Sequence, residues 1–321
     1  MDRNNLNQRL PAIVQSIVAS IHAQSTMQHL NRALLPNRDE IVSAIGLLQQ
    51  LAFPGYFGKQ GLTEENAGFR VGELVMELSE VLFDQVRCCL RHREPCPENP
   101  TPAEAAECDA EAARIVGEFF DRIPAVRALL ATDVQAAFDS DPAATSTDET
   151  IFSYPGLYAI FVQRMAHEFY KLSVPLLPRI MTEHAHSRTG IDIHPGARLG
   201  NKMFIDHGTG VVIGQTCVIG ENVKIYQGVT LGALAPAYGQ LLRGQKRHPT
   251  IEDDVVIYAG ATILGGETVI GKGSVIGGNV FITSSVPPHN IVSAEPPKLK
   301  YRERRRKSSR GPESANLDFQ I

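Results

Sequence analysis

A six-residue rhythm of apolar residues is the feature that most constrains this 321-residue chain. A period of six matches neither the helical period of about 3.6 nor the strand period of about 2. It is typical of a left-handed parallel β-helix, in which three short strands make one triangular coil of about 18 residues. We therefore predict that one apolar series faces inward: Ile193, Leu199, Ile205, Val211, Cys217, Val223 and Val229, then Ile251, Ile257, Ile263, Val269, Val275 and Phe281.

The residues between the hexad positions support the same fold. Gly, Asn and Asp are frequent there, and they suit tight corners where the backbone needs a positive φ. No single coil can bury a core, so the coils must stack on one another. Residues 233–246 lack the hexad, and we predict that they form a loop leaving one corner.

Residues 1–140 have the apolar spacing of helices. We expect these helices within Val14–Ile21, Ile41–Leu51, Val71–Leu90 and Ala103–Phe120, with prolines such as Pro124 between elements. We predict that residues 140–149 form a polar loop whose last residues favour the start of a helix. A helical pattern broken by Pro175 and Pro178 follows from Tyr154 to roughly His184.

The predicted class is therefore α+β, in three parts. A helical N-terminal domain covers 1–188, a left-handed parallel β-helix covers 189–290, and a basic flexible tail covers 291–321.

The composition excludes several function classes. A net charge of -4 gives no reason to expect nucleic-acid binding. The polar start of the chain resembles neither a secretory signal nor a membrane span, so we expect a cytoplasmic protein. Five cysteines without an export signal argue against a disulfide framework. Four of them lack the spacing of zinc ligands, so we predict no metal site: Cys88, Cys89, Cys96 and Cys108.

Titratable residues gather at three places in the apolar repeat. These are Asp192-Ile193-His194-Pro195, Asp206-His207 and Arg247-His248-Pro249. A histidine beside a carboxylate suits general-base catalysis, because the carboxylate stabilises the imidazolium ion. Arginine offers a planar, permanent cation for a substrate carboxylate. By pattern alone, a histidine in a repeat corner is also compatible with an ordinary surface residue.

A set of motifs in fixed order makes the interpretation more specific. Besides the three places above, the chain carries Ile213-Gly214-Gln215-Thr216, Val229-Thr230-Leu231-Gly232, residues 259–265 (AGATILG) and Val286-Pro287-Pro288-His289. Over roughly residues 140–300 the chain resembles the serine O-acetyltransferases, hexapeptide-repeat enzymes that open cysteine biosynthesis. The long helical N-terminal region resembles the larger bacterial subgroup of that family.

The resemblance implies acetyl transfer from acetyl-CoA to the hydroxyl of L-serine, with no covalent acyl-enzyme. Acetyl-CoA would be a co-substrate, and no cofactor would be bound permanently. Position by position, His207 would be the general base and Asp192 its orienting carboxylate. Asp206 would bind the serine ammonium group and Arg247 the serine carboxylate, while His248 would line the same pocket.

The family also implies a groove for the donor between coils of neighbouring subunits. Ala259, Gly260, Gly277 and Gly278 are the candidates for close approach of the pantetheine arm, although coil turns need glycine too. Lys298 is a candidate for a coenzyme phosphate.

One further family acid precedes the repeats. Asp141 has the expected Asp-Pro-Ala context, but Asp148 and Glu149 stay open as alternatives. The chain departs from the family at Gln215, where a glutamate is frequent, and in the longer loop at 233–246.

The resemblance also implies partners. Homotrimers are expected, and helical domains could pair them into a dimer of trimers. The terminal Ile321 could insert into the active site of O-acetylserine sulfhydrylase, the next enzyme. Inhibition by cysteine is common in the family.

Three alternative functions fit parts of the pattern. Another hexapeptide acyltransferase would use a sugar or antibiotic hydroxyl, but Arg247 beside His248 favours an amino-acid carboxylate. A zinc-dependent γ-type carbonic anhydrase needs closely spaced histidines, and the repeat histidines give no His-x4-His pair: His194, His207, His248 and His289. A non-catalytic scaffold would not need His207 and Asp192.

Overall fold

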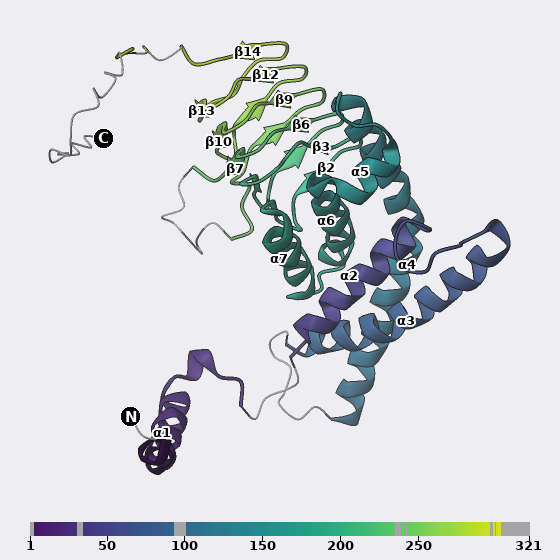
Figure 1. The fold of residues 1–321 in the computed structure, drawn as a ribbon, viewed down its shortest axis with the longest axis vertical. Helices are drawn as coiled ribbons and strands as arrows, with labels where there is room; N and C mark the ends of the chain where they lie inside the picture. Colours follow the sequence, from purple (N-terminus) through teal and green to yellow (C-terminus); the bar gives the residue numbers. More distant parts are fainter. Residues whose placement is uncertain are drawn as a thin grey trace, which may run out of the picture.

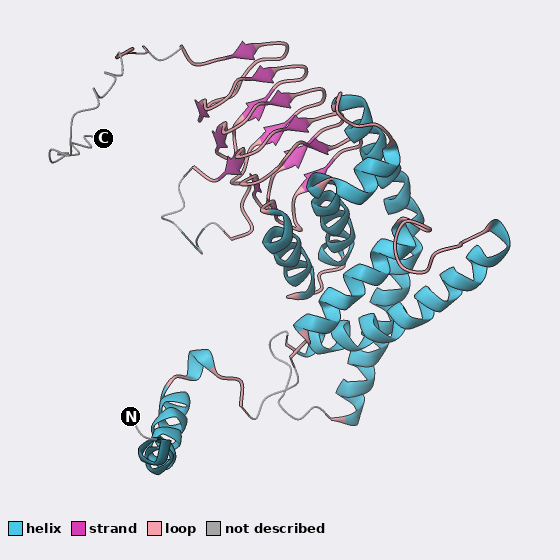
Figure 2. Ribbon diagram, in the orientation of Figure 1, coloured by secondary structure: helices cyan, strands magenta, loops and turns pink. Residues whose placement is uncertain are grey.

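The structure is a computed structural model that describes residues 3–30, 35–92, 101–234, 239, 241, 243–295, 298 and 300–302. Helices precede a stack of short parallel strands, which confirms the predicted α+β class and the left-handed β-helix (Figures 1 and 2). The helical elements are α1 (Arg3–Ala23), η1 (Ser25–Met27), α2 (Arg38–Ala52), α3 (Glu64–Arg91), α4 (Pro102–Ser140), α5 (Thr147–Ser153), α6 (Pro155–Lys171) and α7 (Leu177–Thr189).

The strands form the three faces of a prism. Face 1 contains β1 (Asp192–Ile193), β4 (Val212–Ile213), β7 (Thr230–Gly232), β10 (Thr262–Leu264) and β13 (Phe281–Ile282). Face 2 contains β2 (Arg198–Leu199), β5 (Val218–Ile219), β8 (Thr250–Ile251) and β11 (Val269–Ile270). Face 3 contains β3 (Phe204–Ile205), β6 (Lys224–Ile225), β9 (Val256–Ile257), β12 (Val275–Ile276) and β14 (Ile291–Val292).

Two corners of this prism matter for function. The chain passes from face 3 to face 1 at a corner that we call the His207 corner. It passes from face 1 to face 2 at a corner that we call the Arg247 corner. The two corners are therefore the opposite edges of face 1.

The six-residue rhythm is interrupted in the first coil. Ile193 pairs with Ile213, and Ile213 pairs in turn with Leu231. The chain between Ile193 and Ile213 is two residues longer than the chain between Ile213 and Leu231, and the two additional residues lie in the turn at 206–210. The predicted series therefore follows one inward position of the coil up to Ile205 and a different inward position from Val211 onward.

The rhythm shifts again in the last coils. Val269, Val275 and Phe281 were predicted to face inward, but Ile270, Ile276 and Ile282 are the buried residues, and Phe281 is 70% exposed. Ile263 pairs with Ile282 instead of Phe281, because the turn at Gly265 holds one additional residue. The prediction was wrong here, since one added residue moves every later side chain to the other side of the sheet.

The predicted loop is confirmed at the Arg247 corner. Thr230 on β7 pairs directly with Thr262 on β10, a step along the chain much longer than a regular coil. The additional residues therefore leave the coil between β7 and β8. The chain rejoins the coil at Arg247 and His248.

The helices begin where the sequence supplies caps. Thr63 and Thr101 each form a capping box, and Ser146 accepts a hydrogen bond from the Glu149 amide at the start of α5. Pro124 does not separate two helices, as predicted, but lies inside the long α4. Extensive burial of one α4 side, including the stack of Phe119 on Phe169 at 4.0 Å, offsets the local cost of proline.

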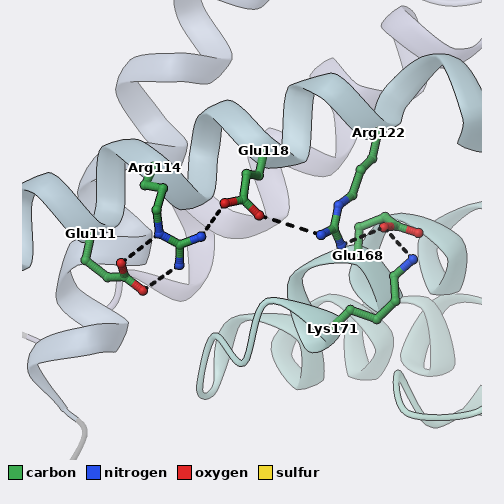
Figure 3. Close-up of polar contacts among 6 residues, drawn as sticks. All are labelled: Glu111, Arg114, Glu118, Arg122, Glu168 and Lys171. Carbon is green, nitrogen blue, oxygen red and sulfur yellow. Dashed lines mark hydrogen bonds and ion pairs between the residues drawn. The ribbon is translucent and has the colours of Figure 1, made fainter.

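A chain of ion pairs runs along α4 and crosses to α6 at Arg122 (Figure 3). Arg114 contacts Glu118, and Arg122 bridges to Glu168 on α6 at 3.2 Å. Lys171 contacts the same Glu168 carboxylate at 2.7 Å. These pairs are mostly solvent-exposed, so each adds little to stability.

The helical domain also covers the open end of the β-helix. The first coil has no coil before it, so its backbone groups need other partners. The buried Arg164 on α6 donates to Leu199 O at 3.2 Å and Gly200 O at 2.7 Å, and it pairs with Asp133 on α4 through two hydrogen bonds. Asp133 in turn accepts from the Met203 amide at 2.9 Å.

Other helix side chains complete this cover. Gln163 donates to Ala197 O at 2.8 Å, and His167 Nδ1 lies 2.7 Å from Pro195 O. Gly156 allows close contact, because a Cβ there would lie 2.1 Å from Ile205 O. No described helix is long and apolar enough to cross a membrane.

We predict that Arg164→Ala lowers the free energy of unfolding by about 3–5 kcal/mol, because it leaves the Asp133 carboxylate buried and unpaired. Urea unfolding followed by circular dichroism measures the change. Arg114→Ala, which removes two exposed ion pairs within α4, is the matched control. An Arg164→Ala effect no larger than that of the control would contradict the prediction.

Candidate active site

The long turn of the first coil carries Asp206 and His207. His207 has a φ of +54°, and a 2.8 Å hydrogen bond from the Gly210 amide to Gly190 O ties the turn to the end of α7. Gly208 suits its position because its φ is +80°, and a Cβ there would also lie 2.4 Å from Ile191 Cδ1. The two added residues lift the imidazole out of the coil, so its side chain is 72% exposed, with Nδ1 3.7 Å from Asp206 Oδ1.

One of the three acids left open by the sequence lies near this histidine. Asp141 ends α4, and its Oδ2 accepts a 2.5 Å hydrogen bond from Tyr154 Oη. That bond, the Ala143 amide and the positive charge of His207 together lower the pKa of the Asp141 carboxyl.

The other two acids have different partners. Asp148 accepts a 2.6 Å hydrogen bond from Tyr56 Oη, and Glu149 accepts hydrogen bonds from the backbone amide and hydroxyl of Thr145. Asp141 is therefore the one of the three acids for which an electrostatic interaction with His207 is found.

Two tyrosines follow on the same corner in the next coils. The rings of Tyr226 and Tyr258 stack with 5.1 Å between centroids and 9° between planes. Burial first, and then the negative charge of Asp206, raise the pKa of Tyr226. The sequence analysis missed both residues, although their position directly after a face 3 strand in successive coils was a usable signal.

His248 is buried at the Arg247 corner, and its hydrogen bonds define its tautomer. Its Nδ1 lies 3.1 Å from the Thr216 amide, which can only donate, so the neutral ring carries its hydrogen on Nε2. Burial, followed by the charges of Arg247 and Lys246, lowers the pKa of His248 to about 4. Gly214 makes room for the ring, since a Cβ there would lie 2.0 Å from its Cδ2.

Arg247 is oriented by a short polar chain. Its guanidinium donates to Gln215 Oε1, and Gln215 Nε2 donates to Tyr170 Oη at 2.9 Å. A glutamine can accept and donate at once, which a glutamate at this position could not do. Lys246, also missed from the sequence, donates its ammonium group to the carbonyls of Thr216, His248 and Pro249. Together these contacts hold the end of the long loop against the coil.

Asp192 lies on β1, the first strand of face 1, and His194 directly follows this strand. Burial, then the charges of Arg179, Arg247 and His248, lower the pKa of His194 to about 4. Asp192 lies 3.6 Å from the Arg179 guanidinium of α7. Asp192 also approaches Glu183 and His186 closely enough for a metal ion, but Arg179 pairs with Glu183 as well as with Asp192, so a cation already occupies this cluster.

The remaining predicted positions are spread along the His207 corner and beyond it. Gly260 has a φ of +72°, and a Cβ at Gly277 would lie 2.9 Å from Val292 O, so both glycines have structural reasons to be there. Ala259 and Gly278 lie on the same corner, and Lys298 is exposed after β14. Ile321 and Cys96 lie outside the described residues. Among the described residues, no disulfide joins the other cysteines, which are Cys88, Cys89, Cys108 and Cys217.

The structure does not bring the two groups of site residues together within one chain. His207, Asp206 and Asp141 gather at one edge of face 1, and Arg247, His248 and His194 gather at the other. His207 pairs with Asp206, whereas His248 contacts Thr216 and Arg247 contacts Gln215.

Comparisons with known proteins bear on this arrangement. No protein-family profile matched the chain. A plasmid-encoded serine acetyltransferase of Synechococcus elongatus is 47% identical over 264 residues, which cover 81% of this chain and 82% of that protein. The serine acetyltransferase of Bacillus subtilis is 46% identical over 168 residues, covering 52% of this chain and 74% of the relative.

Solved structures agree with the sequence relatives. Serine acetyltransferase 1 of Entamoeba histolytica, solved with L-cysteine, has a TM-score of 0.67 and 34% identity, covering 82% of this chain and 88% of that one. The soybean enzyme, solved with serine, has a TM-score of 0.51 and 29% identity, covering 82% and 99% of the two chains. The chain therefore belongs to the serine acetyltransferase family.

Proposed function

We propose that each active site of this serine acetyltransferase forms between two subunits, from the His207 corner of one and the Arg247 corner of its neighbour. The observation that carries the proposal is the position of the two residue groups at opposite edges of face 1. A general base and a carboxylate-binding arginine must act on one small amino acid, and a second copy of the chain brings them together.

Face 1 has the properties of a surface that packs on other copies. Val212 on β4 is 37% exposed and Phe281 on β13 is 70% exposed, both on this face. When three flat faces pack around a threefold axis, each edge meets the opposite edge of the next subunit. This favours a homotrimer.

A second surface could join trimers into the hexamer. Helix α1 exposes several large apolar side chains, which are Leu6, Leu10, Val14, Ile17, Val18 and Ile21. Pairing of these helices between trimers would cover the apolar surface.

In the proposed reaction, His207 takes the proton from the serine hydroxyl while the oxygen attacks the thioester carbonyl of acetyl-CoA. The carbon–sulfur bond then breaks, the imidazolium returns the proton to the departing thiolate, and O-acetylserine and free coenzyme A leave. Asp206 and Asp141 offer carboxylates to the serine ammonium group and to the imidazolium ion. No acyl group is attached to the protein.

The neighbouring subunit supplies the groups that hold the acceptor. Arg247 binds the serine carboxylate, and the neutral His248 donates from Nε2. Asp192, predicted to orient the base, pairs with Arg179 through Oδ1 at 3.6 Å, and its second oxygen is available as an acceptor for the imidazole. Acetyl-CoA lies along the His207 corner, past Ala259, Gly260, Gly277 and Gly278, with Lys298 near its phosphates.

We predict that His207→Ala lowers kcat for serine-dependent release of coenzyme A by about 10²–10⁴-fold, since it removes the base. A thiol reagent detects the release. His289→Ala is the matched control, because His289 also sits in a corner with a positive φ of 60°. Equal activity in the two variants would contradict the assignment of His207 as base.

We predict that the imidazole of His248 stays neutral at pH 6 and titrates near pH 4, because the fold penalises its charged form. The unfolded chain binds this proton near pH 6.5, so the contribution of His248 to stability is full above that pH and is lost as pH falls toward 4. NMR of ¹⁵N-labelled histidine gives the pKa and the tautomer. A His248 pKa above 6 would contradict the proposed neutral donor.

We also propose the complex with O-acetylserine sulfhydrylase through Ile321. A free carboxylate at the end of a tail suits a pocket that accepts an amino acid. Deleting Ile321 should abolish co-elution of the two proteins on gel filtration and leave acetyl transfer intact. Unchanged co-elution would remove this proposal.

A further inference from the structure

Tyr226 and Tyr258 occupy one position of the repeat on successive coils. Each directly follows a strand of face 3, β6 or β9. The same position holds Asp206 in the coil below them and Gly277 in the coil above. We call this row of equivalent positions along the His207 corner the column. It contains the carboxylate of Asp206, the rings of Tyr226 and Tyr258, and then Gly277.

The ladder of two rings is open at one end. One face of the Tyr258 ring lies against Tyr226, and the residue is still 46% exposed. The next position of the column carries no side chain, and a Cβ at Gly277 would lie within 2.9 Å of Val292 O. The position beyond Tyr258 therefore cannot continue the ladder with a ring of its own.

We propose that Tyr258 stacks against the adenine ring of the acyl donor, so that the bound base extends the tyrosine ladder. The inference rests on the proposed function, since it places the thioester at His207. Offset stacking of a flat ring on an exposed aromatic face is a favourable use of such a surface.

The distances along the corner suit this donor. Neighbouring strands lie about 4.8 Å apart, so the position of Gly277 is about 14 Å along the prism from the turn that carries His207. The extended arm between a coenzyme A thioester and its adenine is longer than this. Tyr226 lies between the two ends, where the arm must pass.

Charge at the end of the prism also fits a phosphorylated donor. Lys298, Lys300 and Arg302 closely follow β14, the last strand of the stack. These three cations can neutralise the phosphates that lie next to the adenine.

The test compares two donors that differ only in the nucleotide part, acetyl-CoA and acetyl-pantetheine. The measured quantity is kcat/KM for acetyl-CoA divided by kcat/KM for acetyl-pantetheine, both at saturating serine. Tyr258→Ala should lower this ratio about tenfold or more, by reducing use of acetyl-CoA alone. Tyr258→Phe should keep the ratio, since it keeps the ring face. Tyr301→Ala, which removes a 90% exposed tyrosine outside the ladder, is the matched control.

Calorimetric binding of coenzyme A to the wild type and to Tyr258→Ala separates this inference from the proposed function. A dissociation constant raised about tenfold by the substitution supports stacking, even if the wild type acetylates no serine. The inference is overturned if Tyr258→Ala changes both donors equally, changes neither, or leaves coenzyme A affinity at the wild-type value.

Discussion

The buried pair of Arg164 and Asp133 holds the helical domain against the first coil of the β-helix. A β-helix exposes unpaired backbone groups at its first coil, and such an edge invites aggregation. Here α4 and α6 cover that edge, and the pair satisfies Leu199 O, Gly200 O and the Met203 amide. The first coil is also the coil that carries Asp192, His194 and His207. Stability of the fold and placement of the site therefore share one contact region.

Candidate catalytic residues occur where the repeat is broken. The two added residues of the first coil lift His207 out of the corner, and the long loop returns to the coil at Arg247 and His248. In a regular coil, the side chains point either into the core or outward from a flat face, so few positions allow a base to project beyond a corner. The breaks supply projecting groups, while the regular coils between them keep the corners at a fixed spacing.

Much of this could be predicted from the sequence. The hexad period indicated the β-helix and the loop, because an inward aliphatic position must recur at each turn of the coil. The final coils were misplaced, because a single added residue at Gly265 is invisible in a pattern of Val, Ile and Gly. Pro124 was misread for a related reason, since tertiary packing along α4 overrides a local helix breaker. For the site residues, too, the sequence left a choice that only the structure could make. Choosing Asp141 over Asp148 and Glu149 required the fold, since only contacts distinguish three nearby acids.

Mixed oligomers test most directly whether each site is shared by two subunits. His207→Ala and Arg247→Ala are each expected to be nearly inactive alone. After the two variants are unfolded, mixed equally and refolded together, random trimers should recover about one quarter of wild-type activity, because one site in four receives both intact corners. Activity in the mixture no higher than in either variant alone would contradict the shared site.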